Sequence, residues 1–320
     1  MQDKLIARAK ELLSEGKVKK VVGWKKGLFE DDITPAVFTT AEELDKDFVF
    51  NKYCKANLSK YLVGITKNIE IAKSTTRMNN TMAKQRDPNA QDAPIPQEVV
   101  LVFLKPSDTY SFTQLLKESR ITREDVYAIG VPCQDTLDGG DLCDNCAGKK
   151  PVSCDEYIGV DSNADVAPNT SRMDEVAKLE AMSVEERYNF WRNEFSRCIR
   201  CNACRNVCPA CTCEKCVFDN NALYTTQKVA ETNFEESLFH IIRAWHVAGR
   251  CTDCGECSRV CPQNIPLYLL NRKYIKDINE IYGEYQAGSD MESKPAMLCF
   301  EEDDPETTIV YDRSKDGGNE

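Results

Sequence analysis

The chain has 320 residues, of which 17 are cysteine and only two are histidine, and its formal net charge is −11. The acidic balance argues against a nucleic-acid partner, because phosphate backbones select basic surfaces. Residues 1–20 are charged throughout, unlike a secretion signal, and no stretch approaches the roughly 18 apolar residues of a membrane span. We therefore expect a cytoplasmic protein whose thiols stay reduced and serve metal binding rather than disulfides.

The first hundred residues predict a helix, a strand and a long surface loop. Apolar residues recur at helical spacing over 2–14, and a glycine follows where a C-terminal cap belongs. Residues 18–24 have the apolar character of a strand, and residues 41–72 are mixed but mostly helical. Residues 74–96 are polar and almost devoid of large apolar groups. That composition is typical of a surface loop.

The next segment predicts two buried strands joined by a helix. Residues 98–104 (EVVLVFL) form a continuous apolar run, as expected for a strand covered on both faces. Asp108 is placed to cap a helix near 109–119, and residues 125–131 form a second apolar strand. A strand, a helix and a strand with short joins make a βαβ unit. We therefore predict an α/β domain over residues 1–160.

The second half begins with a segment that has the composition of a linker, residues 161–182. Ser183 and Glu186 then form a capping box, which starts a helix that leads into Cys198. The chain ends in an acidic tail over 288–320, which we interpret as solvated or partner-binding rather than catalytic.

A second capping box, Thr232 with Glu235, predicts another helix over 234–248, just before Cys251. We expect its core face to consist of Phe234, Leu238, Ile241, Ile242 and Trp245. Aromatic residues at such spacing are core more often than electron relays. Together with the preceding helix this predicts a mainly α-helical ferredoxin domain over 183–287.

Two cysteine runs carry the functional argument, and each has the pattern C-x₂-C-x₂-C-x₃-C-P. The first comprises Cys198, Cys201, Cys204 and Cys208, and the second comprises Cys251, Cys254, Cys257 and Cys261. In bacterial ferredoxins three thiolates of a run hold one cubane and the fourth, at the start of a helix, holds the other. We therefore assign to cluster 1 Cys198, Cys201, Cys204 and Cys261, and to cluster 2 Cys251, Cys254, Cys257 and Cys208. Paired zinc ribbons, the alternative, use two C-x₂-C pairs per ion.

The spacing of the two runs resembles a particular kind of dicluster domain. The 42 residues between Cys208 and Cys251 exceed what a compact ferredoxin needs and include the helix predicted over 234–248. This arrangement, over roughly 190–275, resembles the helical ferredoxin domains of the succinate dehydrogenase iron–sulfur subunit and of the corresponding heterodisulfide reductase subunit. The resemblance implies an intermediary that takes up electrons at one end and passes them on at the other.

A third group lies upstream and consists of Cys133, Cys143, Cys146 and Cys154. Four thiolates suit a cluster or a zinc ion, and free thiols are the remaining alternative. The surrounding motifs, FLKPSD at 103–108 and AIGVPCQ at 128–134, resemble the beta-subunit family of coenzyme F420-reducing hydrogenases and formate dehydrogenases. The resemblance, over roughly 98–160, implies a third [4Fe–4S] cluster in an anaerobic redox complex. It also implies bound FAD, for which the sequence offers no recognisable contacts and no G-x-G-x-x-G motif.

A fourth group is Cys211, Cys213 and Cys216, which predicts an additional metal site because three thiols fall within six residues. Its missing ligand could be Cys54, Cys299 or a member of the third group, although isolated cysteines are usually core residues. Several arginines flank the cluster cysteines, where positive charge would raise a cluster's potential: Arg197, Arg200, Arg205, Arg250 and Arg259.

These observations predict an electron-transfer iron–sulfur subunit of a multisubunit cytoplasmic oxidoreductase. It would relay electrons between a flavin or ferredoxin partner and a catalytic subunit such as a formate dehydrogenase or hydrogenase. No catalytic residues are expected, because no Ser/His/Asp set, phosphate loop or carboxylate pair stands out. The enzyme alternative is a flavin subunit that itself oxidises or reduces F420, NADH or another hydride carrier. A zinc-stabilised scaffold is the third possibility.

Overall fold

The structure, a computed structural model, describes residues 1–133, 146, 151–159, 170–219, 233–295, 299 and 302. Its sheet has the order β2-β1-β3-β4-β5, and the strands are β1 (Lys20–Lys26), β2 (Ile33–Phe38), β3 (Val100–Leu104), β4 (Val126–Gly130) and β5 (Glu156–Tyr157). The first, third, fourth and fifth strands are parallel, and β2 is an antiparallel edge. The three predicted strands are therefore present, although β1 begins two residues later than expected.

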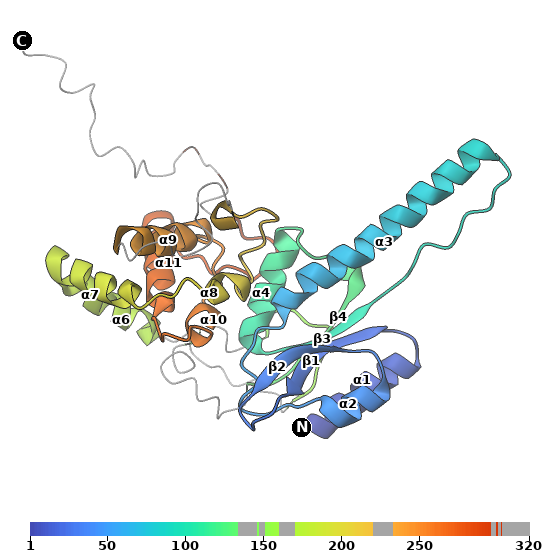
Figure 1. The fold of residues 1–320 in the computed structure, drawn as a ribbon, viewed down its shortest axis with the longest axis horizontal. Helices are drawn as coiled ribbons and strands as arrows, with labels where there is room; N and C mark the ends of the chain where they lie inside the picture. The colour runs from blue at the N-terminus through green and yellow to red at the C-terminus, as the bar shows by residue number, and fades with distance from the viewer. Residues whose placement is uncertain are drawn as a thin grey trace, which may run out of the picture.

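Four helices cover the sheet: α1 (Gln2–Ser14), α2 (Ala41–Asp47), α3 (Ser59–Arg86) and α4 (Pro106–Lys117). Figure 1 shows α1 and α2 on one face and α3 and α4 on the other. Leu5, Leu44, Leu62 and Phe112, one from each helix, belong to a single buried cluster around the strands. The predicted βαβ unit is confirmed, since α4 joins the parallel strands β3 and β4.

The surface loop predicted over 74–96 is wrong, because α3 continues to Arg86 and projects beyond the rest of the α/β half (Figure 1). No glycine or proline interrupts 65–87, and lysine, arginine, methionine and alanine there are good helix formers. Only the returning segment is irregular. Asn80 anchors it, since its side chain exchanges two hydrogen bonds of 2.9 Å with the backbone of Ala93. The low hydrophobicity of residues 74–96 thus correctly indicated that they are exposed to solvent, but it did not indicate that residues 74–86 are helical.

Asp108 does not cap the helix after β3. α4 begins two residues earlier, at Pro106, whose fixed φ suits the first helical position. Asp108 instead lies inside the first turn, fully buried, with its carboxylate 3.0 Å from the Lys105 ammonium. Lys105 also donates to the backbone carbonyls of residues 54, 55 and 56. The pair therefore ties the loop before α3 to the start of α4.

The other half is helical and comprises α6 (Asp174–Ala181), α7 (Val184–Ser196), α8 (Ala203–Asn206), α9 (Asn233–His246), α10 (Glu256–Arg259) and α11 (Leu267–Tyr282). The Ser183–Glu186 capping box at the start of α7 is confirmed. α6 occupies the second part of the predicted linker and packs Val176 and Leu179 against Leu269 of α11. Residues 160–169 and Thr232 of the second capping box lie outside the described residues. The domain limits predicted above stay predictions.

The core face predicted for α9 is mostly wrong. Phe234 and Trp245 are 74% and 56% exposed, and Leu238 and Ile241 are also exposed. The buried side of the helix instead carries Glu236, Phe239, His240, Arg243 and Ala244. Most apolar residues of α9 do share one side of the helix, but that side faces outward and the more polar side faces inward, so amphipathic periodicity did not identify the buried face. Polar side chains are turned inward, which is costly unless they meet partners there.

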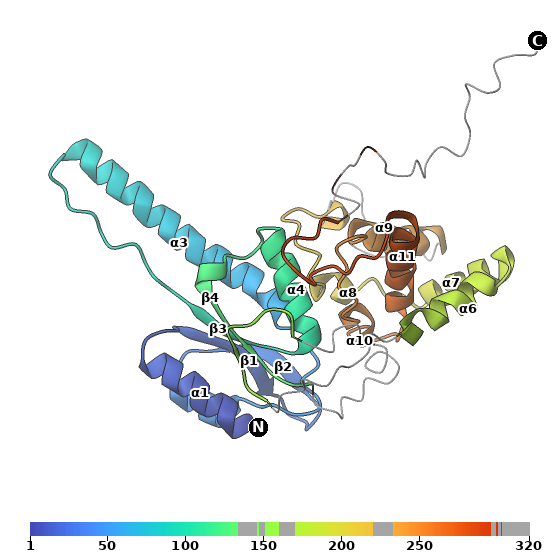
Figure 2. The ribbon, with the colours of Figure 1, turned by 180° about the vertical axis from the view of Figure 1, so that it is seen from behind.

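No helix among the described residues combines the length and the apolar character needed to cross a lipid bilayer. The two halves meet along α4, which lies between the sheet and the helical half in both ribbon views (Figures 1 and 2).

Candidate metal centres

The two cysteine runs share one backbone path. In both runs the residues on either side of the second cysteine have positive φ. They are Arg200 (53°) and Asn202 (62°) in the first run, and Asp253 (57°) and Gly255 (73°) in the second. Three of these four residue types tolerate the left-handed region. Each run then enters a single helical turn, α8 or α10, that carries its third cysteine. The repeated conformation makes the runs local structural copies of each other.

The proline after each run closes a turn and does not begin a helix, contrary to the expectation. Cys211 N–H donates to the Cys208 carbonyl and Asn264 N–H to the Cys261 carbonyl, each at 3.1 Å. Pro209 and Pro262 thus occupy the second position of a β-turn, which their fixed φ favours. α11 begins only at Leu267.

A first cavity collects thiols from both runs. The cysteines lining it are Cys198, Cys201, Cys204 and Cys261. Burial raises the pKa of Cys198 and of Cys204 to about 11. Neutral thiols in this cavity must therefore lose their protons before they can ligate a metal. Phe239, Ile265 and Leu267 supply an apolar wall that shields the cavity from water.

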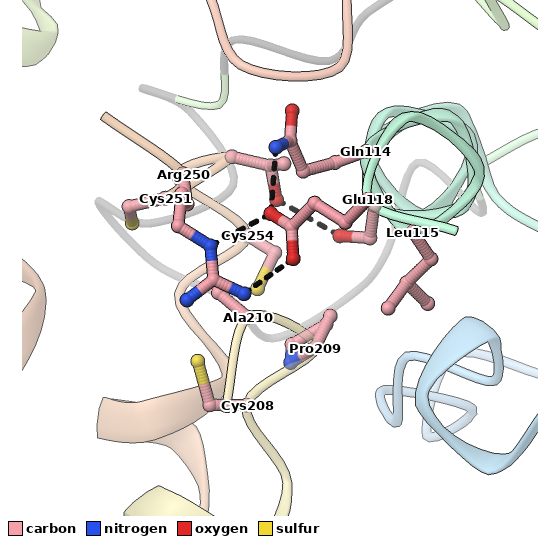
Figure 3. A pocket seen from close by; sticks show the side chains of 11 residues that line it. Gln114, Leu115, Glu118, Cys208, Pro209, Ala210, Arg250, Cys251 and Cys254 are labelled. Carbon is pink, nitrogen blue, oxygen red and sulfur yellow. Dashed lines mark hydrogen bonds and ion pairs between the residues drawn. The ribbon is translucent and has the colours of Figure 1, made fainter. Parts of the chain in front are cut away.

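A second cavity lies between the cysteine loops and α4 (Figure 3). The cysteines lining it are Cys208, Cys251 and Cys254. The buried thiol of Cys257 adjoins this set, since it interacts electrostatically with Cys208. Burial raises the pKa of Cys257 to about 11 and raises that of Cys251 further. As in the first cavity, the fourth thiol of one run, here Cys208, lies close to the first three thiols of the other run.

Comparison with known proteins decides what kind of domain this is. The family of 4Fe-4S dicluster domains matches residues 194–265. The chain contains a 4Fe-4S dicluster domain. The matched range begins within α7 and ends before α11, so it includes both cysteine runs and every cysteine that lines the two cavities.

The chain is also similar in sequence to subunits of F420-dependent formate dehydrogenases. The chain is 32% identical over 103 residues to the beta subunit from Methanocaldococcus jannaschii, which covers 31% of this chain and 26% of that protein. It is 30% identical over 145 residues to the beta subunit of F420-dependent formate dehydrogenase 1 from Methanococcus maripaludis. This match covers 41% of this chain and 36% of that protein. The chain thus spans between about a quarter and just over a third of the length of these relatives. The resemblance to this subunit family that the sequence predicted is confirmed.

Orphaned polar groups around the dicluster domain's cavities fit an anionic occupant. Both ring nitrogens of His240 are buried without a hydrogen-bond partner among the described residues, and burial lowers its pKa to about 3. Arg243 is 2% exposed, and its Nε and Nη1 likewise find no partner in the described parts of the chain. Buried donors need an acceptor or a counter-charge. Clusters held by thiolates would provide both.

Arg243 and His240 were not identified as site residues from the sequence. They stand inside the apolar run of α9, and a charge within such a run was the available signal. Cys198, Glu236 and His240 also have ligand atoms within 4.8 Å of one another, an arrangement that could hold a metal ion. Glu236, however, is already engaged by Arg200 at 3.2 and 3.3 Å, so its carboxylate is better explained as a counter-charge.

The five arginines that flank the cluster cysteines are all paired with carboxylates. The pairs are Arg197–Glu194, Arg200–Glu236, Arg205–Asp219, Arg250–Glu118 and Arg259–Glu256. Each positive charge is thus largely compensated by its neighbour. The sequence-based expectation that these arginines raise the cluster potentials stays a prediction, and the pairing argues against a large effect.

The third cysteine group is only partly described. Cys154 precedes β5, and its Sγ lies against Gly130 at the end of β4, where an added Cβ would approach to 3.1 Å. Cys146 interacts with Tyr110 of α4, and Cys133 is exposed just after β4. Cys143 lies outside the described residues.

The fourth cysteine group adjoins the second cavity. The thiol of Cys211 hydrogen-bonds that of Cys208, which lowers the pKa of Cys208 to about 6. Cys213 is exposed, and Cys216 interacts with Arg205. The candidate fourth ligands lie elsewhere: Cys54 is 1% exposed in the α/β core, and Cys299 interacts with Tyr285.

The α/β half contributes one wall of the second cavity, through α4. Ser111 Oγ lies 2.8 Å from Thr252 Oγ1 in the second cysteine run. Glu118 forms a two-point ion pair with Arg250, of which one contact is 2.7 Å (Figure 3). Lys60 donates to the Cys211 carbonyl at 2.5 Å. These buried or half-buried contacts fix the cysteine loops on the α/β half.

Removing the carboxylate of Glu118 should loosen this junction. In Glu118→Gln we expect the free energy of unfolding to fall by about 2 kcal/mol, because Arg250 keeps its charge in a half-buried site without a counter-charge. Anaerobic denaturant titration measures the change. Glu124→Gln, at an exposed position of the same half, is the matched control and should change stability by less than about 0.5 kcal/mol. Equal effects of the two substitutions would contradict the role given to Glu118.

Proposed function

We propose that this chain is an electron-transfer iron–sulfur subunit of a larger oxidoreductase. The observation that carries the proposal is the pair of buried cavities, each lined by thiols of both cysteine runs, within a matched 4Fe-4S dicluster domain. Free cysteines in a protein that needed them only for packing would not converge in this way. That no disulfide joins the described cysteines supports a reducing compartment, the cytoplasm.

The ligand sets follow from the lining of the cavities. We assign to the first site Cys198, Cys201, Cys204 and Cys261, and to the second Cys251, Cys254, Cys257 and Cys208. The electrostatic neighbours of Cys204 support the first set, since they are Cys198, Cys201 and Cys261. Those of Cys254 support the second, since they include Cys208 and Cys251.

A [4Fe–4S] cluster accepts and releases single electrons when it is bound. The chain's own residues hold and shield the sites. Phe239, Ile265 and Leu267 exclude water from the first, and α4 covers the second. At the first cavity Cys201 is exposed and the neighbouring Ile199 is 55% exposed. We propose this opening as the place where a redox partner docks, because transfer requires a close approach.

A third cluster at Cys133, Cys143, Cys146 and Cys154 is part of the proposal, with zinc as the alternative. Its place beside the second site is supported by α4, where Tyr110 interacts with Cys146 and the next residue, Ser111, lines the second cavity. An additional site at Cys211, Cys213 and Cys216 has weaker support, because Cys211 is paired with Cys208 and no fourth thiol is identified.

The partners are inferred from the relatives, which are beta subunits of F420-dependent formate dehydrogenases. We propose a catalytic subunit of that kind at one end of the relay and a flavin or ferredoxin partner at the other. Direct exchange of hydride with F420 is the second candidate, supported by the F420 in the relatives' names, and bound FAD would mediate this exchange. Extraction of the purified protein separates the two, since only the second candidate requires stoichiometric flavin.

Metal analysis tests the proposed function. Anaerobically purified protein should be brown, should lose its broad visible absorption on addition of dithionite, and should contain about eight or more iron atoms per chain. The reason is the two complete sets of four thiols. A colourless protein with stoichiometric zinc would contradict the proposal, as would iron well below that value after reconstitution.

A further inference from the structure

Arg243 is the one buried cation near the clusters for which the described residues provide no carboxylate. It projects from the inward face of α9 and is 2% exposed. No ion pair joins it to a described acidic side chain, and only Nη2 has a hydrogen-bond acceptor, Asn271 Oδ1, at a long 3.4 Å. By contrast, the five arginines nearest in sequence to the cluster cysteines are all paired with carboxylates.

The side chain lies between the two thiol sets. Its electrostatic neighbours are Cys204 of the first set, Cys208 and Cys257 of the second, and Cys211. Asn271 extends the contact to the second set, since its amide donates to Cys257 Sγ at 3.4 Å. The guanidinium therefore faces ligands of both sites at once.

An unpaired guanidinium in a buried site is strongly unfavourable unless an opposite charge lies nearby. Among the described residues, the groups that can become anionic and that interact most strongly with Arg243 are cysteine thiols. The counter-charge of Arg243 is therefore the bound clusters with their thiolates.

We propose that Arg243 is a shared counter-charge that sets the reduction potentials of both cluster sites together. The inference rests on the proposed function. A fixed positive charge favours the more negative, reduced state of any cluster near it, and the effect is large where water and mobile ions are excluded. Because the same guanidinium faces both sites, it raises both potentials together. Arg243 acts on the clusters through its positive charge and does not ligate them.

The experiment is a potentiometric titration of the full chain carrying Arg243→Met, followed by electron paramagnetic resonance of each cluster. We expect iron to stay at about eight atoms per chain or more. The equilibrium constant for one-electron reduction should fall about tenfold or more at both clusters, a shift of about 59 mV each. Arg243→Lys keeps a positive charge on the same face of α9 and should restore most of this shift.

Arg205→Met is the matched control, because Arg205 directly follows a cluster-site cysteine but is paired with Asp219. Its effect on either potential should stay below twofold. A shift at one cluster alone, or at neither, would overturn the proposal. So would a loss of iron that Arg243→Lys fails to rescue, since shape and not charge would then be the requirement. Wild-type protein without iron would instead refute the proposed function, and iron analysis reads that out before any titration.

Discussion

Serine substitution of the last cysteine of one run should empty the site built mainly by the other run. In Cys261→Ser we expect iron to fall by about four atoms per chain, with loss of the cluster held by Cys198, Cys201 and Cys204. The reason is the first cavity, where Cys261 meets those three thiols. Cys208→Ser should likewise empty the site of Cys251, Cys254 and Cys257. Iron analysis with electron paramagnetic resonance measures both.

Double variants separate crossed from uncrossed ligation without any spectral assignment. If ligation is crossed, Cys201→Ser with Cys261→Ser damages one cluster and leaves about four iron atoms, whereas Cys251→Ser with Cys261→Ser damages both and leaves almost none. Uncrossed ligation reverses the two outcomes. Cys54→Ala is the control, because Cys54 lies in the α/β core away from both cavities and should cost no iron. The reversed pattern would show that each run holds its own cluster.

Removal of the Asp253 charge should strongly destabilise the second cysteine loop. Asp253 is 5% exposed and accepts from Arg272 Nε at 2.8 and 3.0 Å, while Arg172 lies 3.7 Å away. Asp253→Asn keeps the side-chain shape and suits the positive φ at this position, but it leaves two cations without their carboxylate. We expect the free energy of unfolding to fall by about 3–5 kcal/mol, with preferential loss of iron from the second site.

Anaerobic denaturant titration with parallel iron analysis checks this prediction. Asp277→Asn is the matched control on α11, because Asp277 pairs with Lys273 at the surface, where an ion pair contributes about 0–1 kcal/mol. The double replacement Asp253→Asn with Arg272→Met should recover part of the loss, since it removes both buried charges and keeps a residue that tolerates the positive φ. An effect of Asp253→Asn as small as that of the control would mean that the pair does not hold the loop.

Much of the local structure was predictable from the sequence because its causes are local. The apolar run before Pro106 can only be a buried strand, and it is β3. The Ser183–Glu186 box starts α7 where predicted, since a cap depends on four consecutive residues. The cysteine spacing predicted a dicluster domain, which the family match confirms, because the geometry of a cubane restricts how far apart its ligands can stand in a tight loop.

Only the tertiary structure decided which faces meet. The polar residues 74–86 are as compatible with a helix as with a loop, and helix propensity outweighed their low hydrophobicity. α9 turns its more apolar side outward, so its orientation depends on what the cysteine loops require, and they require Arg243 and His240. The wall that α4 supplies to the second cavity comes from residues more than 90 positions away from its cysteines. Contacts of that kind leave no trace in a local pattern, because burial of a charge depends on a partner that the chain brings near only when it folds.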